Sequence, residues 1–216
     1  PYQGPEVRAY KEQLLNLEAQ ALERLDALPH ICRMLHSGRV GNGPGAYRYL
    51  VIEWADGEPV AAMLQEASYE GRSLPIGTLL TMLVQLARVL AEAHLQGLIN
   101  NDVDVKHLYW NEQARNLKVI DWGNAKFTSS PDWASFSFQD DVEQFADVMY
   151  CLLTGRQALD ADRPDLAFWQ EALADVFPVV RDELARIGSQ ASPPQAAYSR
   201  AVELRDDLEA CQARFR

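Results

Sequence analysis

The feature that most constrains the fold of this sequence is the segment 97–126, in which Asp102 and Asp121 each follow a short apolar run. The polar turn 111–116 lies between two stretches with a β pattern, so a hairpin is expected to return the second carboxylate beside the first. Carboxylates at strand ends that face a cleft suit divalent-metal and phosphate chemistry. The same pattern also fits turn residues that cap short strands, and the pattern alone leaves both interpretations open.

The N-terminal part of the chain predicts a long helix followed by an antiparallel hairpin. Apolar residues recur at steps of three and four over residues 5–28, a helical period that ends at Pro29. Two strand-like runs, 31–40 and 47–54, then flank the glycine-rich turn 41–45.

The rest of the chain predicts a mainly helical body. An apolar face predicts a helix over residues 79–96. From Asp141 onward the pattern is helical, with interruptions at Pro164, Pro178 and Pro193-Pro194. With 216 residues, 48% of them apolar, the chain can bury a sizeable core, and the order of elements predicts an α+β fold.

Composition excludes several kinds of partner. The chain carries 20 basic and 31 acidic residues, a net charge of −11, and has no basic stripe. Binding to nucleic acid and docking to anionic membranes therefore lack an electrostatic basis. The apolar run 148–153 is far shorter than the ~20 residues of a membrane span, so no membrane insertion is expected.

The cysteines bear on the cellular compartment. Cys32, Cys151 and Cys211 lie far apart and form neither a disulfide framework nor a C-x-x-C zinc motif. Three buried thiols in a reducing compartment are the simplest interpretation, and no signal-peptide pattern opens the sequence. We therefore expect a cytoplasmic protein.

The segment 97–126 resembles the catalytic region of eukaryotic-type protein kinases, in which a G-[IV]-[IV]-H-R-D-x-K-x-x-N loop precedes a β-hairpin and D-F-G. This chain has GLINND ending at Asp102 and, 19 positions later, DWG beginning at Asp121. The resemblance implies that Asp102 stands at the position of the general base and Asp121 at that of the magnesium ligand. A register with Asp104 as the loop aspartate loses the match of Gly97-Leu98-Ile99.

A second part of the resemblance lies upstream, where residues 50–57 (LVIEWADG) look like the hinge of the family. It implies Ile52 as the gatekeeper, with Glu53 and Ala55 supplying backbone groups that face adenine. ATP and Mg²⁺ are implied as cofactors only if the site is active.

Two helices complete the resemblance, which covers about residues 18–156. Glu18, in the expected first helix, stands at the position of the ion-pair glutamate of helix C. Asp141 begins a stretch similar to helix F, and we expect its carboxylate to accept backbone hydrogen bonds from the loop around Asp102. Both residues are thus expected to be structural.

The implied architecture is a protein-kinase-like α+β fold in two parts. Residues 1–55 would be the remnant of a small lobe, a helix C-like helix and a β-hairpin, and residues 56–216 a mainly α large lobe. No glycine-rich loop and no V-A-I-K lysine precede Glu18. The helix over 5–28 is longer than the family's helix C, so we expect part of its apolar stripe to be uncovered. That stripe would bind a protein partner or a second copy of the chain.

Further departures from the family pattern lie in and after the loop. The His-Arg pair is replaced by Asn100-Asn101, so the arginine that would bind an activation-loop phosphate is missing. Two cofactor-facing positions have also changed, with Asp104 in place of the catalytic lysine and His107 in place of the metal-binding asparagine. Imidazole is a poor ligand for hard Mg²⁺. Only 17 residues, 124–140, precede the helix F-like stretch, and they contain no A-P-E.

These departures predict a degenerate kinase-like domain, a pseudokinase that acts through protein contacts, with Asp102 and Asp121 as vestigial catalytic residues. Two carboxylates ~5 Å apart repel by roughly 3 kcal/mol at an effective dielectric constant near 20, and the offsetting basic side chains of the motif are missing. His107 is expected to be a packed histidine, because no second metal ligand stands at helical or turn spacing from it.

Two enzymatic alternatives stay open. One is an active or truncated ATP-dependent serine/threonine protein kinase, with Asp102 as the base and Asp121 as the magnesium ligand. The other is a small-molecule phosphotransferase of related architecture, which the helix F-like pattern and LLTGR at 152–156 disfavour.

Overall fold

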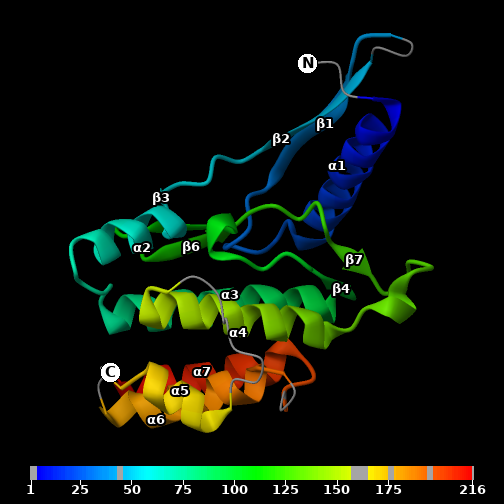
Figure 1. The fold of residues 1–216 in the computed structure, drawn as a ribbon. Coiled ribbons are helices and arrows are strands. Elements are labelled where there is room, and N and C mark those ends of the chain that lie inside the picture. The colour runs from blue at the N-terminus through cyan, green and yellow to red at the C-terminus, as the bar shows by residue number, and fades with distance from the viewer. Residues whose placement is uncertain (1–3, 43–45, 157–164, 175–177, 194–196, 216) are drawn as a thin grey trace.

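The structure, a computed structural model, describes residues 4–42, 46–156, 165–174, 178–193 and 197–215. Its elements in chain order are α1 (Pro5–Leu25), β1 (Met34–Val40), β2 (Tyr47–Ile52), β3 (Glu58–Pro59), α2 (Val60–Tyr69), α3 (Ile76–Leu95), β4 (Leu98–Ile99), η2 (Val105–His107), β5 (Leu108–Asn111), β6 (Asn116–Val119), β7 (Lys126–Phe127), η3 (Trp133–Ser135), α4 (Phe138–Thr154), α5 (Leu166–Ala172), α6 (Pro178–Ala191) and α7 (Ala201–Phe215). Figure 1 shows α1, β1 and β2 as an arm that rises from a body formed by the other elements. The mixture of helices and small sheets is compatible with the expected α+β kinase-like fold, while the domain boundary near residue 55 stays a prediction.

Helix α1 is shorter than expected. The periodic pattern predicts a helix to residue 28, but α1 ends at Leu25, with Asp26 as its C-cap. Pro29 disfavours helical backbone at Leu28, so the helix does not extend to the expected end. Leu28 nevertheless packs against the hydrophobic core, which explains why it continues the apolar period.

The expected hairpin is confirmed. Strands β1 and β2 pair antiparallel from Met34–Ile52 to Val40–Tyr47. Part of the predicted turn, residues 43–45, lies outside the described residues. Strand β1 begins later than expected, because Ile31 forms a parallel bridge with Val119 of β6 instead. This bridge ties the arm to the body.

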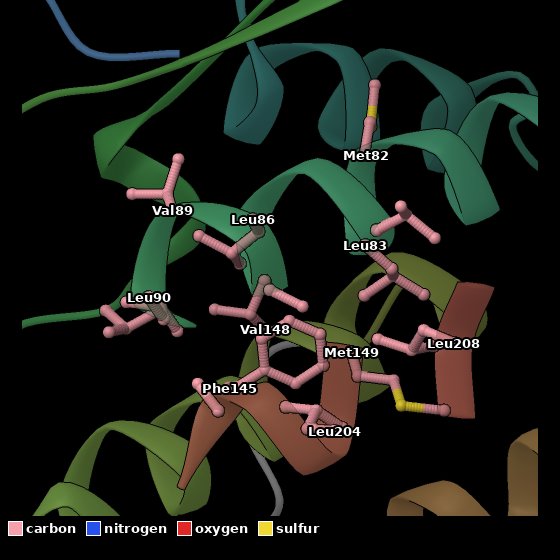
Figure 2. Close-up of a cluster of buried hydrophobic side chains, with 14 of the residues drawn as sticks. Met82, Leu83, Leu86, Val89, Leu90, Phe145, Val148, Met149, Leu204 and Leu208 are labelled. Carbon is pink, nitrogen blue, oxygen red and sulfur yellow. The ribbon is translucent and has the colours of Figure 1, made fainter. Parts of the chain in front are cut away.

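Three helices supply the core of the body. Helices α3, α4 and α7 pack together, and Figure 2 shows side chains from all three in one buried cluster, among them Leu83, Leu86, Phe145, Val148 and Leu204. Each of these five side chains is at most 2% exposed. Helix α3, expected over 79–96, begins at Ile76, directly after Pro75.

Helix α3 is long and apolar enough, by length and composition, to be compared with a membrane span. Among the described helices it passes the length and composition test for a membrane span, which makes it a stronger candidate than the run 148–153. Inside the fold, 67% of its most apolar window is buried.

Several short elements organise the segment 97–126. The expected β-turn-β is confirmed as β5 and β6, which pair from Leu108–Val119 to Asn111–Asn116. Strands β4 and β7, which the sequence analysis did not identify, pair antiparallel and hold the two ends of the segment together. Helix α2, also missed, follows Pro59, a residue type common at helix starts.

The C-terminal region is helical, as the pattern predicted. Pro178 begins α6 rather than interrupting a helix, since its missing N–H is not needed in a first turn. Pro164 and Pro194 lie outside the described residues. The three cysteines are free and buried, as expected.

Candidate functional site

The segment 97–126 brings three chemically active side chains together. Asp102 follows β4, His107 ends η2 and Asp121 follows β6. One oxygen of each aspartate and one ring nitrogen of His107 all lie within 4.8 Å of one another. The hairpin of β5 and β6 thus returns Asp121 beside Asp102, and it brings His107 there as well.

The orientation of His107 follows from its hydrogen bonds. Its Nδ1 lies 2.9 Å from the backbone carbonyl oxygen of Asp102, and because a carbonyl only accepts, Nδ1 carries the proton. The other ring nitrogen, Nε2, lies 3.3 Å from Oδ2 of Asp121. His107 is only 8% exposed, so it is packed as expected. The sequence analysis expected no second ligand at helical or turn spacing, and it is the fold that places Asp102 and Asp121 near this ring.

The loop around Asp102 is anchored by a buried carboxylate. Asp141 of α4 is fully buried and accepts hydrogen bonds from the backbone N–H groups of Asn100 and Asn101, at 2.9 and 2.8 Å. Oδ2 of Asp141 also lies 3.1 Å from Nε2 of His94. Since Nδ1 of His94 accepts from the backbone N–H of Ala201, Nε2 carries the proton and donates to Asp141. The backbone hydrogen bonds expected of Asp141 are therefore present, and they link the loop to α3, α4 and α7.

Two residues of the site have an unusual backbone conformation. Asn101 and Asp121 both have left-handed backbone, with φ of 60° and 61°. Non-glycine residues tolerate this conformation best when they are Asn or Asp, whose short polar side chains bond locally. Oδ1 of Asp121 accepts from the backbone N–H of Gly123, at 3.3 Å.

A lysine to which the sequence assigned no role lies among the loop carboxylates. Nζ of Lys106 lies 3.0 Å from Oδ2 of Asp104 and 3.7 Å from Oδ1 of Asp102. The basic side chains of the family motif are missing, but Lys106 supplies a cation from another position. Asp102 lies in the loop before η2 and Lys106 lies within η2, so this contact depends on the conformation of the loop rather than on helical spacing.

Asp104 is held mainly by Lys106. Burial by itself would raise the pKa of Asp104, but hydrogen bonds from the backbone N–H and the ammonium of Lys106 outweigh it and lower the pKa. Its side chain also caps η2 by accepting from that N–H. The other oxygen of Asp102, Oδ2, accepts from Nδ2 of Asn124 at 2.8 Å, a contact that no local spacing predicts.

Helix α1 adds a further carboxylate to the site. Burial raises the pKa of the half-buried Glu18, and the nearby Asp121 carboxylate raises it further, against a hydrogen bond from the Trp122 backbone and the influence of His107. A Cβ on Gly123 would lie 3.5 Å from Leu14 of α1, which shows how closely the helix approaches this turn. Within the described residues, no lysine or arginine is ion-paired with Glu18.

The hinge-like residues lie where the arm meets the body. Ile52 ends β2, and the backbone N–H of Glu53 donates to the carbonyl of Arg33 at 2.8 Å, while Ala55 is half-buried in the following loop. The Glu53 carboxylate accepts from Nζ of Lys118 at 3.2 Å. Hydrogen bonds from the Arg33 backbone N–H and from Lys118 lower the pKa of Glu53. Lys118 was another residue that the sequence analysis overlooked.

The sequence is similar over part of its length to several curated protein kinases. It is 30% identical over 119 residues to a probable serine/threonine-protein kinase of Dictyostelium discoideum, covering 54% of this chain and 23% of that protein. Over 190 residues it is 26% identical to the serine/threonine-protein kinase pkn2 of Myxococcus xanthus, covering 76% and 22%. Over 85 residues it is 36% identical to the serine/threonine-protein kinase PknA of Mycobacterium tuberculosis, covering 39% and 19%.

These matches support a kinase-like relationship. The chain spans less than a quarter of the length of these three relatives. No family model matches the chain.

Proposed function

We propose that this kinase-like chain is a pseudokinase, a protein-interaction module in which the remains of a catalytic site do not turn over ATP. The observation that carries the proposal is the concentration of carboxylates at the site. Asp102, Asp104 and Asp121 come from one segment. Glu18 of α1 adds a fourth carboxyl, whose pKa is raised by burial and then by the nearby Asp121 carboxylate.

The charge balance of this site disfavours a triphosphate. At about 4 Å, two like charges repel by roughly 4 kcal/mol at an effective dielectric constant of 20. The ammonium of Lys106 is already bound between Asp104 and Asp102, so it is not available to ATP without leaving them. His107 offers a nitrogen where Mg²⁺ prefers oxygen, and Mg²⁺–ATP therefore fits this set of residues poorly.

The arm supplies a surface for a partner. We name as the arm surface four exposed apolar side chains, which are Val7, Tyr10, Val40 and Tyr47. They come from the N-terminal half of α1 and from the adjoining end of the hairpin, where Arg8 lies over the ring of Tyr47. Tyr10 is 57% and Tyr47 is 68% exposed, which is a large exposure for aromatic side chains. We propose that the arm surface binds a protein partner or a second copy of the chain.

A thermal-shift titration with ATP and Mg²⁺ tests the loss of nucleotide binding. The parent protein is expected to show no metal-dependent rise in Tm, since only a ligand that binds the folded state raises it. The double variant Asp104→Lys, His107→Asn restores the side-chain types of the family motif and is expected to gain a rise that requires both ATP and Mg²⁺. Glu66→Lys, on the exposed side of α2, makes the same change of charge away from the site and serves as the control. A clear Mg²⁺-dependent stabilisation of the parent by ATP would contradict the proposal.

The alternative is an active serine/threonine kinase, and one contact favours it. The ammonium of Lys106 lies 3.7 Å from Asp102, so a cation stands beside the carboxylate that would act as base. Phosphoryl transfer depends on such charge stabilisation and on positioning. If the protein transfers phosphate from ATP to itself or to a generic protein substrate, and Asp102→Asn abolishes the transfer, this alternative is correct.

A further inference from the structure

We propose that Asp102, His107 and Asp121 bind a first-row transition-metal ion, Zn²⁺ or Mn²⁺, in preference to Mg²⁺ and without a nucleotide. The inference deepens the proposed function. It rests on that function because these three side chains are open to a metal ion only when ATP does not occupy the site. It departs from the Mg²⁺ that a kinase-like relationship implies, because one of the three donors is an imidazole nitrogen.

The buried imidazole is already oriented as a metal ligand. Its Nδ1–H donates to the Asp102 carbonyl, which leaves Nε2 directed at Oδ2 of Asp121. Two acceptor atoms at 3.3 Å repel unless a proton or a metal ion lies between them. Metal-ligating histidines almost always donate their second ring nitrogen to a carbonyl or carboxylate in this way.

The two carboxylates are also supported by neighbouring groups. Asn124 donates to Oδ2 of Asp102 and the Gly123 backbone donates to Oδ1 of Asp121, so each carboxylate keeps one oxygen for a metal. Oδ1 of Asp102 makes only the longer of the two Lys106 contacts, 3.7 Å against 3.0 Å, so Lys106 can stay on Asp104 when a metal arrives.

The three donors need only a small rearrangement to reach one ion. Ligands ~2.1 Å from a tetrahedral zinc lie about 3.4 Å from one another. The present donor atoms lie within 4.8 Å, and the side chain of Asp121 is 48% exposed and has room to move. Three protein ligands also leave coordination positions for water, as in an open metal site.

The donor types decide between metals. Mg²⁺ and Ca²⁺ select oxygen ligands, whereas imidazole suits Zn²⁺ and other first-row transition ions, whose affinity for a given N/O site rises from Mn²⁺ toward Zn²⁺. One imidazole with two carboxylates therefore predicts binding in the order Zn²⁺, Mn²⁺, Mg²⁺. We expect Zn²⁺ to bind at least ~10-fold more tightly than Mg²⁺.

Isothermal titration calorimetry of the metal-free protein with ZnCl₂, MnCl₂ and MgCl₂, with no nucleotide present, tests the proposal. The expected result is one ion per chain and the affinity order given above. Electron paramagnetic resonance of bound Mn²⁺ gives a second readout. Equal affinity for Zn²⁺ and Mg²⁺, or no Zn²⁺ binding at all, would overturn the inference.

Two variants and a matched control locate the site. His107→Asn is expected to reduce Zn²⁺ affinity by at least ~10-fold and to remove most of the preference over Mg²⁺. Asp121→Asn, at a more exposed side chain, is expected to weaken all three ions and guards against misfolding of the buried variant. His36→Asn, an exposed histidine of β1, controls for adventitious zinc binding and is expected to change nothing. Loss of zinc binding in the His36 variant, or its persistence in both site variants, would place the metal elsewhere and contradict the proposal.

The same protein samples separate this inference from the proposed function. ATP stabilisation of the parent with intact zinc preference would contradict the pseudokinase proposal and leave the metal site standing. If the parent bound neither ATP nor Zn²⁺, the metal site would be contradicted and the pseudokinase proposal would stand.

Discussion

The arm and the body of this protein differ in where their exposed and buried apolar residues lie. In the body, helices α3, α4 and α7 bury most of their apolar side chains in one cluster, and Phe145 is fully buried. In the arm, the C-terminal half of α1 buries Leu22 and Leu25 in the core, whereas Tyr10 and Tyr47 at the far end are more than half exposed. The body is thus built for stability, while the arm carries surface that a binding partner can use.

The site lies where the two regions meet. Glu18 reaches it from the arm, whereas Asp102, His107 and Asp121 reach it from the body. Lys118 of the body ties the hinge-like Glu53 to the backbone carbonyl of Ile31. Because both regions contribute charged groups, a change in the position of the arm relative to the body would directly change the distances between the charges of the site.

The largest effect is expected in the core of the body. Phe145→Ala removes a fully buried ring among Leu86, Val148 and Leu204 and is expected to lower the free energy of unfolding by about 3–5 kcal/mol. Urea denaturation followed by circular dichroism measures the loss. A loss below about 1 kcal/mol would show that the packing around Phe145 contributes little to the stability of the body.

A smaller but substantial effect is expected at the anchor of the loop. Asp141→Asn replaces a buried carboxylate that accepts from two backbone N–H groups and from His94 with an amide that has only one acceptor oxygen. We expect a loss of about 2–4 kcal/mol in the same denaturation experiment. Asp182→Asn, at an exposed position of α6, is the control and should stay near the parent. An equal loss in the two variants would mean that the anchor is not specific.

Where the arm meets the body, at Glu18, we expect a substitution that raises stability instead of lowering it. Since the pKa of Glu18 is raised in the fold, protonation of this carboxyl stabilises the protein, and that stability is lost as pH rises through the folded-state pKa. Glu18→Gln imitates the protonated form, so at pH 7 it is expected to raise Tm by up to about 2–4 °C.

The pH dependence checks the cause of that rise. Below the usual glutamate value of 4.5 the parent is protonated as well, so the advantage of the variant should vanish. Thermal melts at several pH values measure both effects. A lower Tm for the variant at pH 7 would show that the Glu18 carboxylate has a stabilising partner, and would contradict the view that burial and the nearby Asp121 disfavour its charged form.

The smallest effect on stability is expected on the arm surface. Tyr10→Ser removes a side chain that is 57% exposed and should change the free energy of unfolding by no more than about 0.5 kcal/mol. The same variant should bind less of an apolar fluorescent dye than the parent, because it removes part of an exposed apolar surface. A loss as large as that of Phe145→Ala would show that Tyr10 is packed, and the distinction between arm and body would fail.

Local pattern predicted several elements well and others poorly. The β1–β2 hairpin, the β5–β6 hairpin and helix α3 were all found from period and turn residues, because those signals arise within a few neighbouring residues. Helix α2 and the paired strands β4 and β7 were missed. Strands of two residues have no period of their own, and the pairing that defines them joins segments far apart in the chain.

For the candidate site, the sequence by itself determined the chemistry of the side chains: aspartates where a kinase-like loop places them, an imidazole in place of a carboxamide, and an anion in place of a lysine. Only the tertiary structure decided which of these groups meet. It put His107 between Asp102 and Asp121, set Lys106 among the carboxylates and brought Glu18 to the turn at Asp121. The physical reason is that spacing along a chain fixes only local geometry, whereas ligation and charge repulsion depend on distances between atoms that packing alone brings together.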